Sequence, residues 1–332
     1  MRLRRFSLSA LCCFFVFWLA ACSSTSSGTD SATTPDPSMA ASTSSSGGKA
    51  EVGVAIFDMS DKFVSYITQG MKVSATKQNV QVSYVDAQND TATQVKQIQQ
   101  FISDGVKSIV LIPTDESSAD QSIALANKAN VPIIVVNRYY KSVDNATSYV
   151  GSDSTTAGTM QMEAVAKLLN GKGNIAIMNG EMGTEAQINR TKGNKDIIAK
   201  YPNMKVVLED TANYDRAQGM ALMAKWLSSG TTINAVVANN DEMIIGAMLA
   251  AQLDNKDKDM IFAGVDATMD ALEFVKAGRL QVTVFQNAPE QGSQAIKAAV
   301  AAADGQTVQK QIMVPYELVT KDNVEAYIAK WQ

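Results

Sequence analysis

Short apolar runs alternate with longer amphipathic stretches from residue 52 onward. The apolar runs, rich in Val, Ile and Ala, occupy residues 52–57, 80–85, 108–112, 132–136, 174–178, 206–208, 235–238, 260–265 and 280–285. The stretches of helical length occupy residues 62–77, 91–104, 119–130, 156–170, 185–200, 216–229 and 243–252. Wholly apolar strands that alternate with helices are typical of βαβ units, whose parallel sheets are covered on both faces. The pattern therefore predicts an α/β fold.

The number of these units exceeds what one open sheet accommodates comfortably. The half of the chain from Asn174 also repeats the strand–helix rhythm of the half from Val52. We therefore expect two doubly wound parallel-sheet lobes, with the change from one to the other near residues 149–153. In such sheets a ligand binds beyond the carboxyl ends of the strands, so the residues after each apolar run are the candidates for a site.

The N-terminal segment has the features of an export signal. Three arginines lie within the first five residues, an apolar stretch follows over residues 8–18, and the segment ends at Leu19-Ala20-Ala21-Cys22. A membrane-spanning helix needs about 20 apolar residues, so this stretch is short for one. The ending resembles the lipobox of bacterial lipoproteins, which implies removal of residues 1–21, lipid on Cys22 and a membrane anchor outside the cytoplasm. A plain secretory signal with a chance cysteine is the alternative.

Residues 22–50 are rich in Ser, Thr, Gly, Pro and Ala and have almost no large apolar side chain. Such a composition buries too little surface to offset the entropy of ordering the chain, so we expect a flexible tether. The folded part is then expected to begin near Glu51.

Composition excludes several classes of function. Removal of the three N-terminal arginines, with no acidic residue among residues 1–21, changes the formal net charge from −4 to −7, which disfavours nucleic acid as a partner. The chain has no histidine, which excludes His-dependent nucleophiles and His-bound zinc, although carboxylate or lysine chemistry stays open. Cys22 would be the only thiol left, so no disulfide is expected. We expect no metal and no cofactor.

Acids, amides, arginines and aromatic residues follow the apolar runs. They are Asp58, Asp61, Phe63, 113–115, 137–139, 184–190, 214–216, 239–242, Asp266, Gln286 and Asn287. Sugar hydroxyls both donate and accept hydrogen bonds, so carboxylates, guanidinium groups and amides together suit a neutral polyhydroxylated ring, whose C–H faces pack on aromatic planes. The glycine-rich segment 171–173 precedes a strand, which is the wrong context for binding phosphate.

Several short motifs occur together in one order. They are 104–106 with 112–115, 131–133 with 137–138, 239–243 with 246–247, and 264–267. With these motifs, residues 51–332 resemble the periplasmic sugar-binding proteins of the ribose/galactose type, which serve ABC transporters. The resemblance implies a monomer that captures a small neutral sugar or cyclitol and delivers it to a membrane permease. It also implies two lobes, residues 51–151 with 287–312 and residues 152–286 with 313–332, that close about three crossings near Gly151, Asn287 and Pro315-Tyr316.

The resemblance assigns ligand-binding roles to one set of residues. It implies a stacking aromatic, an aromatic wall, hydroxyl acceptors, two ligand arginines and three amides; the set is Asp61, Phe63, Asn137, Arg138, Arg190, Tyr214, Asn240, Asp266 and Gln286. Ordinary structural readings exist for four of them. Asp61 and Asn240 could cap helices without binding ligand, although for the helix that begins beside Asn240 we expect Asp241 to be the cap. Arg190 could form an i,i+4 pair, and Tyr214 could simply pack against its neighbours.

Three positions depart from the ribose and galactose binders. Asn137 stands where both carry Asp, Ile112 where ribose binders carry Asn, and Lys62 where the ribose branch carries an aromatic residue. The stretches closer to the inositol- and rhizopine-binding branch are 188–193, 226–230, 282–286 and 315–320. These features favour myo-inositol, with ribose, galactose, glucose or xylose as alternatives.

Two other functions stay open at this stage. The same fold can serve as a sensory receptor that passes a sugar or furanosyl signal to a chemoreceptor or kinase. An exported carboxylate-dependent glycoside hydrolase, using a pair such as Asp61 and Asp266, is a weaker alternative. A transcriptional repressor shares the core fold, but the export signal and the missing DNA-binding segment disfavour it.

Overall fold

The computed structural model describes residues 51–331. The predicted signal peptide, the predicted lipidation site Cys22 and the predicted tether lie outside the described residues. The strands are β1 (Val52–Ile56), β2 (Val82–Asp86), β3 (Ser108–Ile112), β4 (Ile133–Val136), β5 (Ser148–Gly151), β6 (Lys172–Asn179), β7 (Asn203–Thr211), β8 (Ala235–Ala238), β9 (Ile261–Ala263), β10 (Thr283–Gln286), β11 (Gln311–Met313) and β12 (Tyr316–Val319).

The helices alternate with these strands over most of the described chain. They are α1 (Lys62–Gln78), α2 (Thr91–Asp104), α3 (Glu116–Lys128), α4 (Ser154–Leu168), α5 (Glu185–Ile198), α6 (Arg216–Ser228), α7 (Asp241–Leu253), α8 (Met269–Lys276), α9 (Ala288–Ala303) and α10 (Val324–Ile328), with short 3₁₀ turns at Lys141–Asn145 and Asp257–Asp259. Most helices begin directly after a residue whose side chain accepts a hydrogen bond from the first turn, such as Asp90, Asp115 or Asp153.

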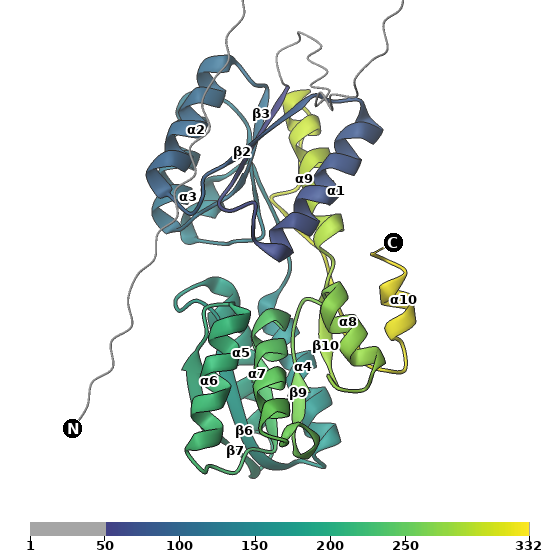
Figure 1. Cartoon of the computed structure of the whole chain (residues 1–332). Helices are drawn as coiled ribbons and strands as arrows, with labels where there is room; N and C mark the ends of the chain where they lie inside the picture. Colours follow the sequence, from purple (N-terminus) through teal and green to yellow (C-terminus); the bar gives the residue numbers. More distant parts are fainter. Residues whose placement is uncertain (1–50, 332) are drawn as a thin grey trace, which may run out of the picture. The chain divides into compact units, whose positions relative to one another are not determined.

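The first sheet is entirely parallel and has the order β11-β5-β4-β3-β1-β2. Helices α1 and α9 cover one face and helices α2 and α3 cover the other (Figure 1). Helices α1 and α9 lie close together because Gly70 faces the backbone of Pro289, where a Cβ atom would have no room. The apolar β1 and β3 are therefore buried on both sides, as their sequences predict.

The second sheet has the order β7-β6-β8-β9 and is also parallel. Two bridges, Ala263 with Val282 and Asp266 with Phe285, continue it to β10, which pairs antiparallel with β12. Helices α4 and α5 pack on one face, and helices α6, α7, α8 and α10 contribute to the core on the other. The predicted α/β fold class with parallel sheets is thus confirmed.

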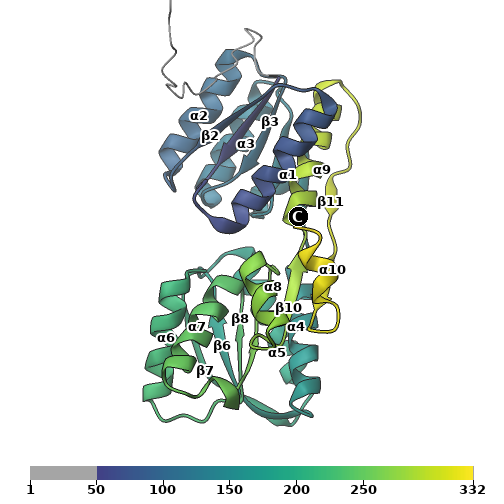
Figure 2. The same ribbon diagram turned by 45° about the vertical axis from the view of Figure 1, so that its right-hand side comes forward.

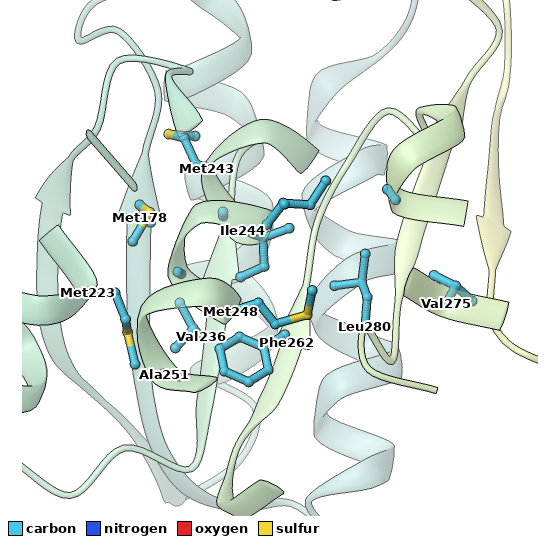
Figure 3. Close-up of a cluster of buried hydrophobic side chains, with 14 of the residues drawn as sticks. Met178, Met223, Val236, Met243, Ile244, Met248, Ala251, Phe262, Val275 and Leu280 are labelled. Carbon is cyan, nitrogen blue, oxygen red and sulfur yellow. The ribbon is translucent and has the colours of Figure 1, made fainter. Parts of the chain in front are cut away.

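The larger core of the second sheet is rich in methionine. Figure 3 shows Met178, Met223 and Met248 in the same core as Phe262, with Met248 beside the ring, and each of these side chains is buried. Methionine is unbranched and fills irregular gaps, so these side chains pack between helix α7 and the sheet. The packing fixes the position of helix α7, whose N-terminal end carries Asn240.

The chain passes between the two sheets three times, from β5 to α4, from β10 to α9, and from β11 to β12 (Figure 2). The first and third connections are joined by a hydrogen bond of 2.8 Å from the amide of Val314 to the carbonyl of Gly151. We propose that the two sheets define the N-terminal and C-terminal lobes outlined above. Strand β11 ends at Met313, one residue beyond the boundary that the sequence analysis placed at residue 312.

Candidate functional site

A cavity that is partly open to solvent lies at the carboxyl ends of the strands of both sheets, and the space at this site is about 730 Å³ when the open solvent at its mouth is counted. Its walls carry acids, amides, arginines, hydroxyls and aromatic rings from both sheets. The lining residues are Phe57, Asp61, Phe63, Val64, Asn137, Arg138, Tyr139, Tyr140, Ser152, Ser154, Thr184, Glu185, Ala186, Arg190, Tyr214, Asn240, Asp266 and Gln286. All nine residues that the sequence analysis singled out as ligand-binding candidates line this one cavity.

Asp61 both caps a helix and faces the cavity. Its Oδ1 accepts a hydrogen bond of 2.9 Å from the amide of Val64, which orders the first turn of helix α1. The same turn brings Phe63 to the cavity wall. Burial raises the pKa of the Asp61 carboxyl, although the Val64 amide and the charge of Arg138 oppose that shift. Asp61 therefore caps helix α1 and lines the cavity at the same time.

Arg138 is fixed by contacts on three sides. Its Nη1 donates a hydrogen bond of 2.7 Å to the carbonyl of Thr114, and its guanidinium carbon lies 3.7 Å from the centre of the Phe57 ring. Its Nη2 also lies 3.8 Å from Glu181, which belongs to the loop after β6. The guanidinium group is thereby held in one orientation at the cavity wall.

Asn137 adopts a positive φ of 66°, a conformation that Asn tolerates better than most residues. Its Nδ2 lies 3.3 Å from Oε1 of Gln291, and Nε2 of Gln291 donates a hydrogen bond of 2.9 Å to Ser152. This chain of polar groups connects the end of β4 to helix α9 and to the first crossing between the sheets. The neutral amide of Asn137 is therefore held in place through its contact with Gln291.

Arg190 lies at the centre of the opposite wall. Its Nη1 donates to the carbonyl of Asn239 at 2.6 Å, and its Nη2 donates to Gln286 at 2.7 Å and to the Tyr316 hydroxyl at 3.0 Å. These partners come from three other segments, so the reading of Arg190 as a local i,i+4 pair is wrong. Its Nε is buried and has no hydrogen-bond partner among the described residues. This N–H donor of the guanidinium group is therefore not used by any described residue of the protein.

Asp266 sits on a backbone turn of unusual conformation. The φ angles are 119° at Asp266 and 52° at Ala267, which are costly for residues other than glycine. Asp241 holds this turn, because its Oδ2 accepts from the Thr268 amide at 2.8 Å and its Oδ1 accepts from the Thr283 hydroxyl at 2.7 Å. Backbone strain that is held in this way at a cavity wall is typical of functional sites.

Burial dominates the electrostatics of these two acids. It raises the pKa of Asp266 well above its ordinary value, although the positive charge of Arg190 opposes the shift. Burial also raises the pKa of Asp241 to about 7, against the hydrogen bonds from Thr283 and Thr268. For Arg190, burial disfavours the charged form, yet Tyr316 and Asp266 raise its pKa overall, so the guanidinium group stays protonated.

Asn240 and Tyr214 form a connected pair. Asn240 caps helix α7, because its Oδ1 accepts from the Met243 amide at 3.0 Å, and its Nδ2 donates to the carbonyl of Tyr214 at 3.2 Å. Our expectation that Asp241 is the cap is therefore wrong. The Tyr214 hydroxyl lies 2.9 Å from Thr184, and burial raises its pKa to about 12, so the phenol stays neutral.

Sequence reasoning did not single out several lining residues. These are Phe57, Tyr140, Ser152, Ser154 and, as individual residues, Tyr139, Thr184 and Glu185. Ser154 donates a hydrogen bond of 2.9 Å to Glu185, which brings a further carboxylate to the cavity. The two serines follow β5, which is one of the strands without a predicted apolar run. The position of Tyr139 and Glu185 within the strand-end segments was the only available signal.

Two features are absent from residues 51–331. Within this range no group of three or more His, Cys, Asp or Glu side chains is arranged to hold a metal ion. No helix in the same range combines the length and the apolar character needed to cross a bilayer.

The family model described as a periplasmic binding protein domain matches residues 52–307. The chain belongs to this family. The match spans most of the described residues, including the cavity and the first two crossings between the sheets. Membership of this family implies an extracytoplasmic location. The family and the relatives compared below are described as binding proteins rather than enzymes.

Three relatives illustrate the family. An ABC transporter solute-binding protein from Bacillus halodurans, solved with bound myo-inositol, is 50% identical with a TM-score of 0.82, and the match covers 86% of this chain and 99% of that one. The Caulobacter myo-inositol-binding protein, bound to myo-inositol, is 28% identical with a TM-score of 0.80 over 86% and 98%. A Rhizobium meliloti protein, provisionally named rhizopine-binding, is 39% identical over 83% and 91%. The predicted resemblance to sugar- and cyclitol-binding proteins is confirmed.

Proposed function

We propose that this periplasmic binding protein captures a neutral cyclic polyol, with myo-inositol favoured, and delivers it to an ABC permease. One observation carries the proposal: nine acids, amides, arginines and aromatic residues from both sheets line a single cavity. The solved relatives with bound myo-inositol support the choice of ligand. A ring that carries a hydroxyl on every carbon offers donors and acceptors around its whole rim, which matches mixed carboxylates, amides and guanidinium groups.

In this proposal the two walls bind the same ring from opposite sides. Asp61 and Arg138 of one wall and Asp266 and Arg190 of the other bind hydroxyl groups. The remaining members of the nine contribute amide hydrogen bonds and aromatic cover; they are Phe63, Asn137, Tyr214, Asn240 and Gln286. Because the charged groups are mostly buried, each hydrogen bond to the ligand gains strength from the low local dielectric.

Ligand capture then proceeds by hinged closure about the three crossings. A ligand that contacts both lobes shifts the balance from open to closed by its differential affinity for the closed form. The closed lobes present a joined surface to the permease. No chemical step is proposed for the bound ring, so purified protein is expected to leave glycosides and cyclitols unchanged.

Calorimetry on the purified chain tests the proposal. We expect one site per chain for myo-inositol, weaker binding of scyllo-inositol, ribose, galactose, glucose and xylose, and a rise in melting temperature that follows the order of affinity. Absence of binding to every member of this panel contradicts the proposed ligand class. Release of sugar from a glycoside by the purified chain would favour the hydrolase alternative. Permease and ATPase genes beside this gene, rather than a kinase gene, favour transport over sensing.

We also propose that Cys22 carries the membrane anchor. Metabolic labelling of the expressed chain with a radioactive fatty acid is expected to mark the wild type and leave Cys22→Ala unmarked. Equal labelling of the two chains contradicts the anchor. Ligand binding by Cys22→Ala is expected to be unchanged, because the residue precedes the folded part.

A further inference from the structure

Lys62 follows the cavity residue Asp61, yet its side chain points to a different set of partners. Its Nζ lies 2.7 Å from Oδ2 of Asp270 at the start of helix α8 and 3.9 Å from Oε1 of Glu242 in helix α7. Lys62 begins helix α1, which packs on the first sheet, whereas both acids belong to helices that pack on the second. The lysine therefore connects the two lobes.

The acids that receive Lys62 are already assembled by Arg216. The Nε and Nη2 of Arg216 form a bidentate pair with Glu242 at 2.7 and 2.8 Å, and Nη2 also lies 2.7 Å from Asp270. These three residues come from helices α6, α7 and α8 of one lobe and carry a net charge of −1. Lys62 brings the cluster to neutrality. Loss of Lys62 leaves Asp270 paired with Arg216, so the acceptor cluster stays in place.

We propose that Lys62 is a positioning residue that holds the Asp61–Phe63 wall of the cavity against the opposite lobe when the lobes are closed. This inference rests on the proposed capture of a ligand between the lobes.

The expected effect is modest and falls on release of the ligand. Lys62 and Asp270 keep 36% and 40% of their side-chain surface exposed, and exposed ion pairs contribute little unless they belong to a network. A double-mutant coupling of the usual size for such pairs corresponds to about a two- to fivefold faster release. The pair forms only on closure, so the rate of association is expected to stay the same. Salt screens exposed charges, so added salt is expected to speed release from the wild type.

The test compares Lys62→Met, Asp270→Asn and the double variant by stopped-flow release of myo-inositol into excess competitor. The matched control is Lys276→Met, because Lys276 pairs at 2.9 Å with Glu325 of the same lobe. We expect faster release from both single variants, no further increase in the double variant, and no change in the control. Raising NaCl from about 50 to 500 mM should accelerate release from the wild type more than from Lys62→Met.

Small-angle X-ray scattering of the unliganded chains makes the test independent of the ligand. At low salt Lys62→Met is expected to have a larger radius of gyration than both the wild type and Lys276→Met. If the wild type binds no polyol, the proposed function fails, and identical scattering of the three chains then overturns the role of Lys62 separately. If myo-inositol binds, additive or absent effects of Lys62→Met and Asp270→Asn on release overturn it.

Discussion

Nη1 of Arg190 lies 3.5 Å from Oδ1 of Asp266, and each side chain exposes only 6% of its surface. Two charges that are removed from water in this way stabilise the fold only as a pair, since each alone carries a large desolvation cost. Both residues line the cavity, and both belong to elements that pack on the second sheet. In the proposed function the pair therefore contributes to stability and to ligand binding in one place, and substitutions can separate the two contributions.

We expect Arg190→Met to lose ligand binding and to reduce the free energy of unfolding by about 3–5 kcal/mol, because Asp266 is left buried without its partner. Adding Asp266→Asn should recover most of the stability and none of the binding. Urea unfolding and calorimetry with myo-inositol measure the two quantities. Lys195→Met is the control on the same helix, because its partner Glu209 is on the surface of that lobe. Ligand affinity that survives in Arg190→Met contradicts the proposed site.

Gln94 is a buried link between helix α2 and the loop after β3. Its Nε2 donates to the carbonyl of Ile112 at 3.0 Å, and its Oε1 accepts from the amide and hydroxyl of Thr114 and from the Ser118 hydroxyl. We expect Gln94→Leu to reduce the unfolding free energy by at least about 2 kcal/mol, since each buried polar group left unpaired costs about 1–3 kcal/mol.

The same substitution should also weaken ligand binding, because the carbonyl of Thr114 is the acceptor that orients Arg138. Gln100→Leu is the matched control, since Gln100 is an exposed residue of the same helix and its Nε2 donates a hydrogen bond of 2.8 Å to Asp104 on the same surface. A change within about 0.5 kcal/mol is expected for that control. Equal losses of unfolding free energy in the two variants, measured by urea unfolding, would contradict this role of Gln94.

The strands that could be predicted from the sequence are those buried on both faces. Strands β1, β3, β4 and β8 consist almost wholly of buried apolar residues, so their runs stand out. Strand β5 has four residues and includes Ser148 and Gly151, and β7 extends beyond the predicted 206–208 because its outer residues are exposed at the sheet edge. The buried positions of helix α9 include only one large apolar side chain, Ile296, and are otherwise Ala, Gly and Gln residues.

The residues of the candidate site that follow strands could be predicted from the sequence, whereas the tertiary contacts that hold the site together could not. The position after a strand was enough to single out Asp61, Arg138 and Asp266. The partners of Arg190 lie 49 to 126 residues away along the chain, so no local pattern shows that its guanidinium group is held by them. Asn240 caps helix α7 in place of the expected Asp241. The Asp241 side chain instead accepts a hydrogen bond from Thr283, which lies 42 residues away along the chain and which no local pattern shows.

Asp241 gives the stability of the protein a specific dependence on pH. Because burial raises the pKa of Asp241 to about 7, the folded chain keeps a proton that the unfolded chain releases near pH 4. The contribution of this group to stability is therefore complete below about pH 4 and is lost as the pH rises toward 7. Asp241→Asn, which stays neutral, should lose less stability over that interval than the wild type.

The difference between the two chains should grow by about 1.4 kcal/mol for each unit by which the folded pKa exceeds its ordinary value. Urea unfolding at intervals between pH 4.5 and 7.5 measures it. Asp322→Asn, at an exposed turn, is the control and should follow the wild type. Parallel curves for Asp241→Asn and the wild type would mean that Asp241 does not hold a proton in the folded chain.

Trp331 provides an optical signal for closure. Its ring centre lies 4.2 Å from that of Tyr66 in helix α1, and its Nε1 donates a hydrogen bond of 2.8 Å to the carbonyl of Ala267, beside Asp266. Trp331 thus contacts both lobes, whereas Trp226, the other tryptophan of residues 51–331, is buried in the core of the second sheet. In the proposed hinge motion, opening of the lobes would separate Trp331 from Tyr66, while its bond to Ala267 would keep it with the second sheet. Ligand-induced closure should therefore change the tryptophan emission.

We expect myo-inositol to change the emission of the wild type and of Trp226→Phe by similar amounts, and to leave that of Trp331→Phe nearly unchanged. Tyr66→Ala should remove most of the signal and weaken binding about two- to tenfold, the loss expected for one aromatic pair. Titration followed by fluorescence, with calorimetry as the independent measure of affinity, tests both expectations. A signal that survives in Trp331→Phe and disappears in Trp226→Phe would place the ligand-induced change inside one lobe, against closure between two.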